Sequence, residues 1–256
     1  MSIKKDVQDQ FGKNAESYVS SLIHKKGKDL AKMIEIANLQ GNERAVDIAT
    51  GGGHTANAFA PFVQKVTAVD LTSEMLTAAE KFIKQNGNLN VDFLQGDAEN
   101  LPLEKESFEI VTCRIAPHHF PHVDKFVSEV YRILVFGGQF LLDDNVAPER
   151  KEFDEFYNTV EKIRDYSHFR AWKKTEWIQM LEQEGFVIEE TYRFEKTFMF
   201  QEWCDRMRLQ ESVKAELNEI MAKAADPIKK KFSIQIENGD VKSFKGEAVL
   251  LKAIKS

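Results

Sequence analysis

Between residues 45 and 144 the sequence alternates short apolar segments with amphipathic ones, and this alternation restricts the possible folds more than any other feature. The apolar segments have the length of β-strands, and the amphipathic ones repeat their apolar residues with the spacing of a helix. The predicted strands span residues 45–49, 65–71, 91–97, 108–114 and 139–144. Such an alternation indicates a parallel sheet covered by helices on both faces.

The chain changes character on both sides of this region. Helical spacing runs through the first 40 residues, and two further amphipathic helices follow Pro148. A sixth strand is predicted at 186–194 and a last one at 246–254, late enough in the chain to pair antiparallel with the sixth. We therefore predict an α/β fold with seven strands, the last of them antiparallel, and helical elements that cap the sheet.

Composition argues against several classes of function. The formal net charge of −6 disfavours nucleic acid as a partner, since binding to phosphates needs clustered Lys and Arg. No apolar run approaches the ~20 residues that span a bilayer, and the first residues lack the apolar segment of a secretory signal. Cys113 and Cys204 lie too far apart in sequence to form a metal-ligand pair. We predict a cytoplasmic protein without a metal, a membrane span or a nucleic-acid partner.

The first predicted strand runs into three glycines in the stretch AVDIATGGGHT. Gly51-x-Gly53-x-x-Ala56 fits a variant of the dinucleotide-binding pattern, and an acidic residue follows at Asp70. An NAD(P)-dependent oxidoreductase is therefore one candidate. Asp47 favours another ligand, because a carboxylate this close to a pyrophosphate would repel it and would instead attract an ammonium group.

S-adenosyl-L-methionine (SAM) meets that requirement, because it carries an α-amino group, a sulfonium, a ribose and an adenine but no phosphate. Ligands bind at the carboxyl ends of the strands in an open α/β sheet. There Asp47 would accept from the ammonium group, Asp70 from two ribose hydroxyls, and Asp97 from the adenine amino group. Ala98 would offer its backbone N–H to the adenine ring. The full set of predicted cofactor-binding residues is Asp47, Ala49, Gly51, Gly53, Asp70, Leu71, Met75, Asp97, Ala98 and Arg114.

Five stretches of the sequence resemble, in order and spacing, the motifs of class I SAM-dependent methyltransferases. They are VDIATGGG, VDLTSEML, GDAENLP, FEIVTCRIAPHHF and RILVFGG, and they cover roughly residues 40–145. The sequence is most similar to the methyltransferase type 11 branch, typified by the ubiquinone and menaquinone C-methyltransferases. FGKNAESY (11–18) resembles the N-terminal lid of that branch, and RDYSHFR (164–170) resembles an uncharacterised bacterial subgroup of it.

The resemblance implies a Rossmann-like, doubly wound, mostly parallel sheet within a single domain, 1–256. Its parts would be N-terminal lid helices (1–40), a SAM-binding core (41–145), a cap insertion (148–172), and C-terminal helices with the antiparallel strand pair (174–256). It further implies methyl transfer from SAM to a small molecule, with S-adenosyl-L-homocysteine (SAH) as the product. Neither the acceptor nor the choice between a monomer and a homodimer follows from the sequence.

The glycine loop departs from the family pattern at Ala49, where a first glycine is usual. Alanine is tolerable there if its φ is negative and its Cβ points away from the ligand, because only a positive φ would demand glycine. A non-catalytic SAM-binding module therefore stays open as an alternative function. Val135-Phe136 replaces the usual Lys-Pro before the double glycine, which affects a turn and not the cofactor.

The reacting end of the site should lie beyond the fourth predicted strand, where His118 and His119 follow. Methyl transfer from a sulfonium is an in-line displacement, so the protein supplies alignment and, for some acceptors, a base. Histidine is the natural base for a phenol, a carboxylic acid or a carbon acid. We predict both histidines as catalytic candidates, of which one faces the site. The alternative is that they only fix the loop by hydrogen bonds.

A second group of candidates would hold the acceptor. Arg164, Asp165, His168 and Arg170 lie in the predicted cap, and arginines with a histidine would suit an anionic acceptor. A surface salt-bridge network is the alternative interpretation. The predicted substrate-binding residues are Arg114, which would position the loop or a carboxylate, Asp165, His168, Arg170, and Tyr18, which would cover the pocket.

Overall fold

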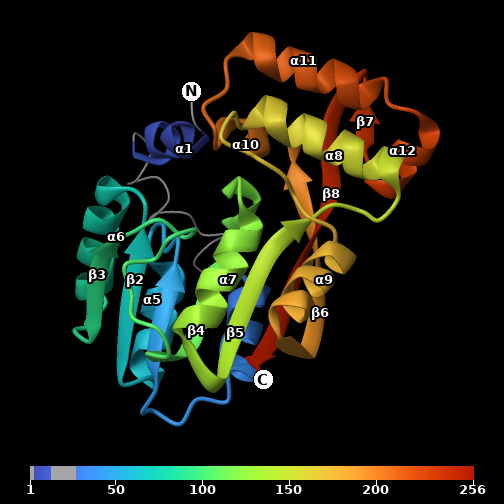
Figure 1. Cartoon of the computed structure of the whole chain (residues 1–256). Coiled ribbons are helices and arrows are strands. Elements are labelled where there is room, and N and C mark those ends of the chain that lie inside the picture. The colour runs from blue at the N-terminus through green and yellow to red at the C-terminus, as the bar shows by residue number, and fades with distance from the viewer. Residues whose placement is uncertain (1–2, 13–26) are drawn as a thin grey trace.

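The computed structural model describes residues 3–12 and 27–256. One mixed sheet runs through it, with its strands in the order β3-β2-β1-β4-β5-β8-β6 and with β7 paired to β8 (Figure 1). The strands are β1 (Arg44–Ile48), β2 (Lys65–Asp70), β3 (Val91–Gln95), β4 (Phe108–Arg114), β5 (Leu134–Val146), β6 (Phe186–Met199), β7 (Gln235–Glu237) and β8 (Asp240–Lys255). Strands β1 to β5 pair in parallel, and β8 runs antiparallel to both β5 and β6. The predicted doubly wound α/β class and the antiparallel last strand are confirmed.

Helices flank the sheet and extend beyond one end of it. They are α1 (Ile3–Gly12), α4 (Lys28–Ile36), α5 (His54–Phe59), α6 (Ser73–Gln85), α7 (Val123–Ile133), α8 (Lys151–Arg164), α9 (Lys174–Glu184), α10 (Phe200–Asp205), α11 (Glu211–Ala222) and α12 (Asp226–Lys231), with short 3-10 helices η1 (Ala60–Phe62) and η2 (Pro117–His119). Within the described ranges, no helix has the length and apolar character that crossing a membrane requires.

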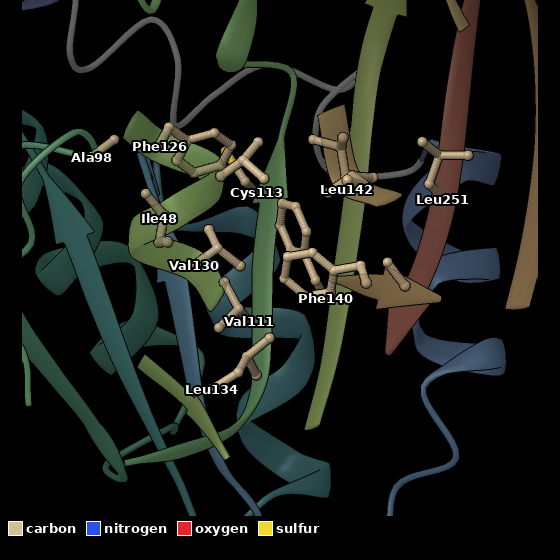
Figure 2. Close-up of a cluster of buried hydrophobic side chains, with 14 of the residues drawn as sticks. Ile48, Ala98, Val111, Cys113, Phe126, Val130, Leu134, Phe140, Leu142 and Leu251 are labelled. Carbon is tan, nitrogen blue, oxygen red and sulfur yellow. The ribbon is translucent and has the colours of Figure 1, made fainter. Parts of the chain in front are cut away.

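Alternate residues of each buried strand point to opposite faces of the sheet, and each face carries its own apolar core. Val111 packs in a cluster with Phe140, Leu251 and side chains of α7 and α9 (Figure 2). Its neighbour Ile110 belongs to a second cluster, which α4, α5 and α6 cover. Strands buried on both sides in this way explain why the sequence shows continuous apolar segments instead of an apolar and polar alternation.

A third cluster lies in the layer formed by α8, α10, α11 and α12. Figure 1 shows these helices together beyond the arrowhead end of β5, which leads directly into them through Ala147. Trp203, Tyr157 and Phe244 are among the buried side chains of this cluster. The layer draws on both the predicted cap insertion, 148–172, and the segment predicted to follow it, 174–256.

Several strands differ from the prediction. Strand β6 continues to Met199 instead of residue 194, β8 starts at Asp240 instead of residue 246, and β3 ends at Gln95 instead of residue 97. Strand β5 starts at Leu134 instead of residue 139, so the pair Gly137-Gly138 lies inside the strand and does not end the preceding helix. A shift of register against β4 accommodates the pair. Strand β7 is an eighth strand beyond the seven predicted. It joins β8 through Asn238-Gly239, where both residues have the positive φ that two-residue hairpin turns require.

Gly53 allows the loop after β1 to pack closely against α6. It is the N-cap of α5 and has a φ of +80°. A Cβ atom at this position would lie 2.9 Å from Ile83 Cδ1 and 3.0 Å from Ala79 Cβ. Glycine is therefore required here both for the backbone conformation and for the contact between helix and loop.

Gly53→Ala is expected to lower the free energy of unfolding by about 2 kcal/mol or more, because a left-handed alanine is strained and its methyl group overlaps α6. Gly87→Ala is the matched control, since Gly87 has a φ of +85° but nothing lies within 4 Å of a Cβ there. Urea unfolding of both variants measures the two losses. Equal losses would show that the contact with α6 is not their cause.

Candidate functional site

A pocket opens at the carboxyl ends of β1, β2, β3 and β4. The loops after these strands form most of its wall, and Lys4, Val7 and Phe11 of α1 complete it. Asp47 and Gly53 do not line it. The other predicted cofactor-binding residues do, namely Ala49, Gly51, Asp70, Leu71, Met75, Asp97, Ala98 and Arg114.

Asp47 lies behind the glycine loop and holds it in place. Its carboxylate accepts hydrogen bonds from Thr50 Oγ1 at 2.6 Å, from Thr112 Oγ1 at 2.7 Å and from the backbone N–H of Ala56 at 3.2 Å. Burial raises the pKa of Asp47 to about 6, although these hydrogen bonds oppose the shift. The direct contact with an ammonium group stays a prediction. The geometry itself gives the carboxylate a supporting role for the loop.

Ala49 does not have the negative φ under which alanine was expected to be tolerated in the glycine loop. Its φ is +54°, in the left-handed region where glycine is favoured, and not negative. An alanine in this conformation costs about 1–2 kcal/mol. The surrounding contacts maintain it: the N–H of Thr50 donates to the carbonyl of Val69 at 2.9 Å, and the N–H of Gly51 donates to Asp70 Oδ2 at 2.8 Å.

Ile115, which also lines the pocket and follows the neighbouring strand β4, has the same backbone strain. Its φ is +54°, which is an outlier for a β-branched residue. Its N–H donates to the carbonyl of Asp143 at 2.7 Å, so the end of β5 fixes this conformation. Strained residues cluster at functional sites, where their surroundings impose an otherwise unfavourable conformation. The sequence motifs contain no signal that singles out Ile115.

Asp70 is buried at the end of β2 and faces the pocket. Its Oδ2 accepts from the N–H of Gly51 at 2.8 Å, and its Oδ1 accepts from the N–H of Thr72 at 2.9 Å. Burial raises its pKa, and the two backbone N–H groups counteract that shift. Each oxygen retains a second lone pair for a ligand hydroxyl.

Asp97 contacts the N-terminal helix as well as the pocket. Lys4 Nζ of α1 lies 2.5 Å from Asp97 Oδ2 and 2.5 Å from Glu99 Oε2. The second oxygen of Glu99 accepts from the backbone N–H of His122 at 2.7 Å. Lys4 therefore ties α1 to the loop after β3. Sequence reasoning identified Asp97 but missed its partners, since nothing in the sequence relates residue 4 to residue 99.

Arg114 lies in the pocket wall between two buried carboxyl groups. Its Nη2 donates to Asp29 Oδ2 at 2.9 Å, and its Nε lies 3.4 Å from Asp143 Oδ2. Lys196 Nζ lies 3.9 Å from the same oxygen of Asp29. The side chain of Arg114 is only 4% exposed, and its ion pairs order the strand ends, while its predicted contact with the cofactor or acceptor stays a prediction.

The two carboxyl groups beside Arg114 differ in protonation. Burial raises the pKa of Asp143 to about 8, and the charge of Asp29 acts in the same direction. Burial also tends to raise the pKa of Asp29, but the charge of Arg114 and the other neighbours lower it to about 2. At neutral pH Asp143 is therefore mostly protonated while Asp29 is a carboxylate.

His118 and His119 occupy different environments although they are adjacent. His119 lines the pocket, and its Nδ1 lies 3.0 Å from the carbonyl oxygen of Ser167. His118 does not line the pocket, and its Nδ1 lies 2.6 Å from Asp144 Oδ1. Burial tends to lower the pKa of His118, but the charge and hydrogen bond of Asp144 outweigh it and the pKa is raised. Burial and the charge of His118 lower the pKa of His119 to about 4.

The predicted cap cluster is not in the pocket. Asp165 accepts from the N–H and Oγ of Ser167, His168 Nε2 bonds to Asn158 Oδ1 at 3.0 Å, and Arg170 pairs with Asp154 and Glu176. These contacts join the loop at 165–170 to α8 and α9. Asp165 and His168 are buried, and of the three only Arg170 forms ion pairs with described residues, so the contacts differ from a surface salt-bridge network, and binding of the acceptor by these residues stays a prediction. Tyr18 lies outside the described residues.

Similarity to known proteins identifies the family of this chain. Residues 46–142 match the model of the methyltransferase domain. The chain is 38% identical to the uncharacterized methyltransferase YcgJ of Bacillus subtilis over 96% of its own length and 97% of that protein. A crystal structure from Bacillus halodurans C-125, whose name assigns it to the methyltransferases, is 56% identical with a TM-score of 0.88, covering 90% of this chain and 99% of that one.

A more distant similarity is to a ubiquinone/menaquinone biosynthesis C-methyltransferase, UbiE of Brucella suis, which is 30% identical over 59% of this chain and 60% of that protein. The chain belongs to the class I SAM-dependent methyltransferases. SAM is therefore the cofactor of this methyltransferase, and the alternative of an NAD(P)-dependent oxidoreductase is set aside.

The pocket of the methyltransferase fits SAM chemically. The buried Asp70 has lone pairs left for hydroxyl groups, and Leu71 and Met75 offer apolar surface for a flat ring. Gly51 has no side chain, so its backbone is open to close approach by the ligand. Among the residues that the structure describes, no group of three or more His, Cys, Asp or Glu side chains is arranged to hold a metal ion.

Asp143→Asn is expected to change how the stability of the methyltransferase depends on pH. A carboxyl with a raised folded pKa contributes stability that is complete below its unfolded pKa and is lost as the pH rises to about 8. The asparagine stays uncharged, so the wild type should lose about 2 kcal/mol relative to the variant between about pH 6 and 8. Denaturant unfolding at several pH values measures this, with the exposed Asp240→Asn as control. Parallel profiles of wild type and Asp143→Asn would contradict the protonated state.

Proposed function

We propose that this enzyme transfers the methyl group of SAM to a small-molecule acceptor by in-line displacement in the pocket at the carboxyl ends of β1 to β4. The acceptor oxygen, nitrogen or carbon forms a bond to the methyl carbon while the carbon–sulfur bond breaks and its electron pair stays on sulfur, which gives SAH. The sulfonium needs no further activation, so the protein mainly aligns the two reactants and excludes water.

The observation that carries this proposal is the arrangement of Asp70. Two backbone N–H groups fix its carboxylate at 2.8 and 2.9 Å, one to each oxygen. The remaining lone pairs of the two oxygens suit a pair of neighbouring hydroxyls, such as those of a ribose. Dinucleotide-binding folds place an acidic residue at the same strand end to bind a ribose, so the choice of SAM over a dinucleotide rests on the family to which the chain belongs.

The adenine would lie between the ends of β2 and β3. Leu71 and Met75 provide apolar cover for its faces, and Asp97 and the backbone N–H of Ala98 provide the hydrogen bonds for its edge. The methionine part of SAM would then lie along the loop from Ala49 to Gly51. Asp47 supports this loop from behind, so we assign its carboxylate to positioning the loop that receives the amino acid moiety.

The helices around the core would enclose the reactants. Helix α1 carries Lys4 and Phe11 into the pocket and serves as a lid, and the layer of α8, α10, α11 and α12 serves as the cap of a single domain. Cys113 and Cys204 are both free and buried, which supports a reducing compartment such as the cytoplasm.

A transfer assay with radiolabelled SAM and a panel of small hydroxy, amino and carbon-acid compounds tests the function. Label should appear in at least one acceptor, in an amount that depends on enzyme concentration. If the protein binds SAH but labels no acceptor, and SAM is not consumed in cell extract either, the alternative of a non-catalytic SAM-binding module would replace the enzyme.

Asp70→Asn should weaken SAH binding at least tenfold, because one charged acceptor for two hydroxyls is lost and each such hydrogen bond contributes about 1.5 kcal/mol or more. Asp92→Asn is the control, since Asp92 lies on the neighbouring strand β3 with its side chain 61% exposed. Isothermal titration calorimetry gives both affinities. If Asp70→Asn binds SAH as tightly as Asp92→Asn, the ribose position is wrong.

A further inference from the structure

The pocket wall beyond β4 is mostly apolar and contains one basic nitrogen. Ile115, Ala116 and Phe120 from the segment around η2 form this wall together with Phe11 of α1 and His119. The rings of Phe11 and His119 meet edge to face at 5.1 Å. If SAM lies along the loops after β1 to β3, this wall borders the space left for the acceptor.

The hydrogen bond of His119 determines which of its nitrogens carries the proton. Its Nδ1 lies 3.0 Å from the carbonyl oxygen of Ser167, and a carbonyl can only accept, so Nδ1 is the N–H donor. The Oγ of Ser167 lies 3.3 Å from the same nitrogen. In the neutral ring, Nε2 then has a free lone pair, and it has no hydrogen-bond partner among the described residues.

His118 helps to fix the loop that carries Ser167, the hydrogen-bond partner of His119. Its Nδ1 is bound to Asp144, and its carbonyl accepts the N–H groups of Phe169 and Arg170, each at 2.9 Å. The loop that carries Ser167 is thereby fixed against η2. His118 is therefore a positioning residue, and of these two histidines it is His119 that borders the pocket.

The charges around the pocket disfavour an anionic acceptor. Among the described residues that line it, the cationic side chains are Lys4 and Arg114. Lys4 lies between Asp97 and Glu99, and Arg114 lies between Asp29 and Asp143. The carboxylates of Asp70, Asp97 and Glu99 add negative charge to the wall. An anion in this space would meet neutralised cations and apolar side chains, so no group of the described wall would compensate its lost hydration, and only the sulfonium of SAM would attract it.

From these observations we infer that the acceptor is an uncharged, largely apolar molecule with a phenol-type hydroxyl, and that His119 is the base for its methylation. The hydroxyl oxygen bonds to the methyl carbon of SAM, the carbon–sulfur bond breaks with its electron pair left on sulfur, and the hydroxyl proton passes to His119 Nε2 and then to solvent. This inference rests on the proposed methyl transfer.

Because His119 is a weak base, the acceptor group that suits it is a phenol-type hydroxyl. A neutral amine attacks with a lone pair that it already has, whereas a hydroxyl gains nucleophilicity only by losing its proton. A phenol-type hydroxyl, with a pKa of about 10, releases its proton to a weakly basic imidazole far more readily than an aliphatic alcohol does. Burial and the charge of His118, opposed by the charges of Asp165 and Asp144, keep the pKa of His119 at about 4, so its ring is unprotonated at neutral pH and is a weak base.

A matched pair of probes tests the acceptor class: 2-naphthol, which is uncharged at neutral pH, and 2-naphthoate, which has the same ring system and a negative charge. With radiolabelled SAM, the full-length enzyme should methylate 2-naphthol and should act on 2-naphthoate about a hundredfold more slowly or not at all. Equal or faster labelling of 2-naphthoate would overturn the inference. Binding of SAH without methylation of 2-naphthol would also overturn it and leave the proposed methyl transfer standing, whereas failure to bind SAH would remove the proposed function itself.

His119→Asn tests the base, because the asparagine amide can still donate to the Ser167 carbonyl but has no counterpart of Nε2. We expect kcat for 2-naphthol to fall about a hundredfold, with KM and SAH affinity nearly unchanged. His122→Asn, at the N-cap of α7 and outside the pocket lining, is the control and should keep wild-type kcat.

The pH profile separates a base from a merely structural residue. The wild-type rate should stay level from about pH 6 to 8, because His119 is already unprotonated there. The rate of His119→Asn should rise about tenfold per pH unit toward the hydroxyl pKa of about 10, since only the ionised acceptor then reacts. An unchanged kcat, or a reduced kcat with the level profile of the wild type, would overturn the role of His119.

Discussion

The buried carboxylate of Asp47 is the contact on which the geometry of the site depends. Its three hydrogen bonds join the end of β1 to the glycine loop through Thr50, to the start of α5 through Ala56, and to β4 through Thr112. A carboxylate without such donors would be expensive at this depth. With them it holds the loop in the one conformation that aligns Gly51 with Asp70.

Further buried polar contacts connect this edge of the sheet to the surrounding helices. Arg114 at the end of β4 binds Asp29 in the first turn of α4, and His118 of η2 binds Asp144 near the end of β5. These pairs contribute little net stability once desolvation is counted, but removal of one partner would leave a buried charge. They therefore fix the position of each element around the pocket, while the apolar clusters supply most of the folding free energy.

Much of the fold followed from patterns that are local in the sequence. The parallel strands, the antiparallel last strand and the position of Asp70 at the end of β2 were all predicted from apolar periodicity and motif order, while Asp97 lies in the loop just beyond β3. The errors have physical causes that a local pattern does not contain. The φ of Ala49 is set by contacts with the end of β2, and the extension of β5 through Gly137-Gly138 depends on a bulge against β4.

By itself the sequence determined the class of fold, the glycine loop and the chemistry of the cofactor, because these depend on periodicity and on residues close together in a motif. Only the tertiary structure decided which polar residues border the pocket and which hold other parts of the fold together. It separated His119, which borders the pocket, from His118, which binds Asp144, and it assigned Asp165 and Arg170 to the packing of the cap. The physical reason is that a side chain's role depends on its partners, and here those partners lie many residues away in the chain.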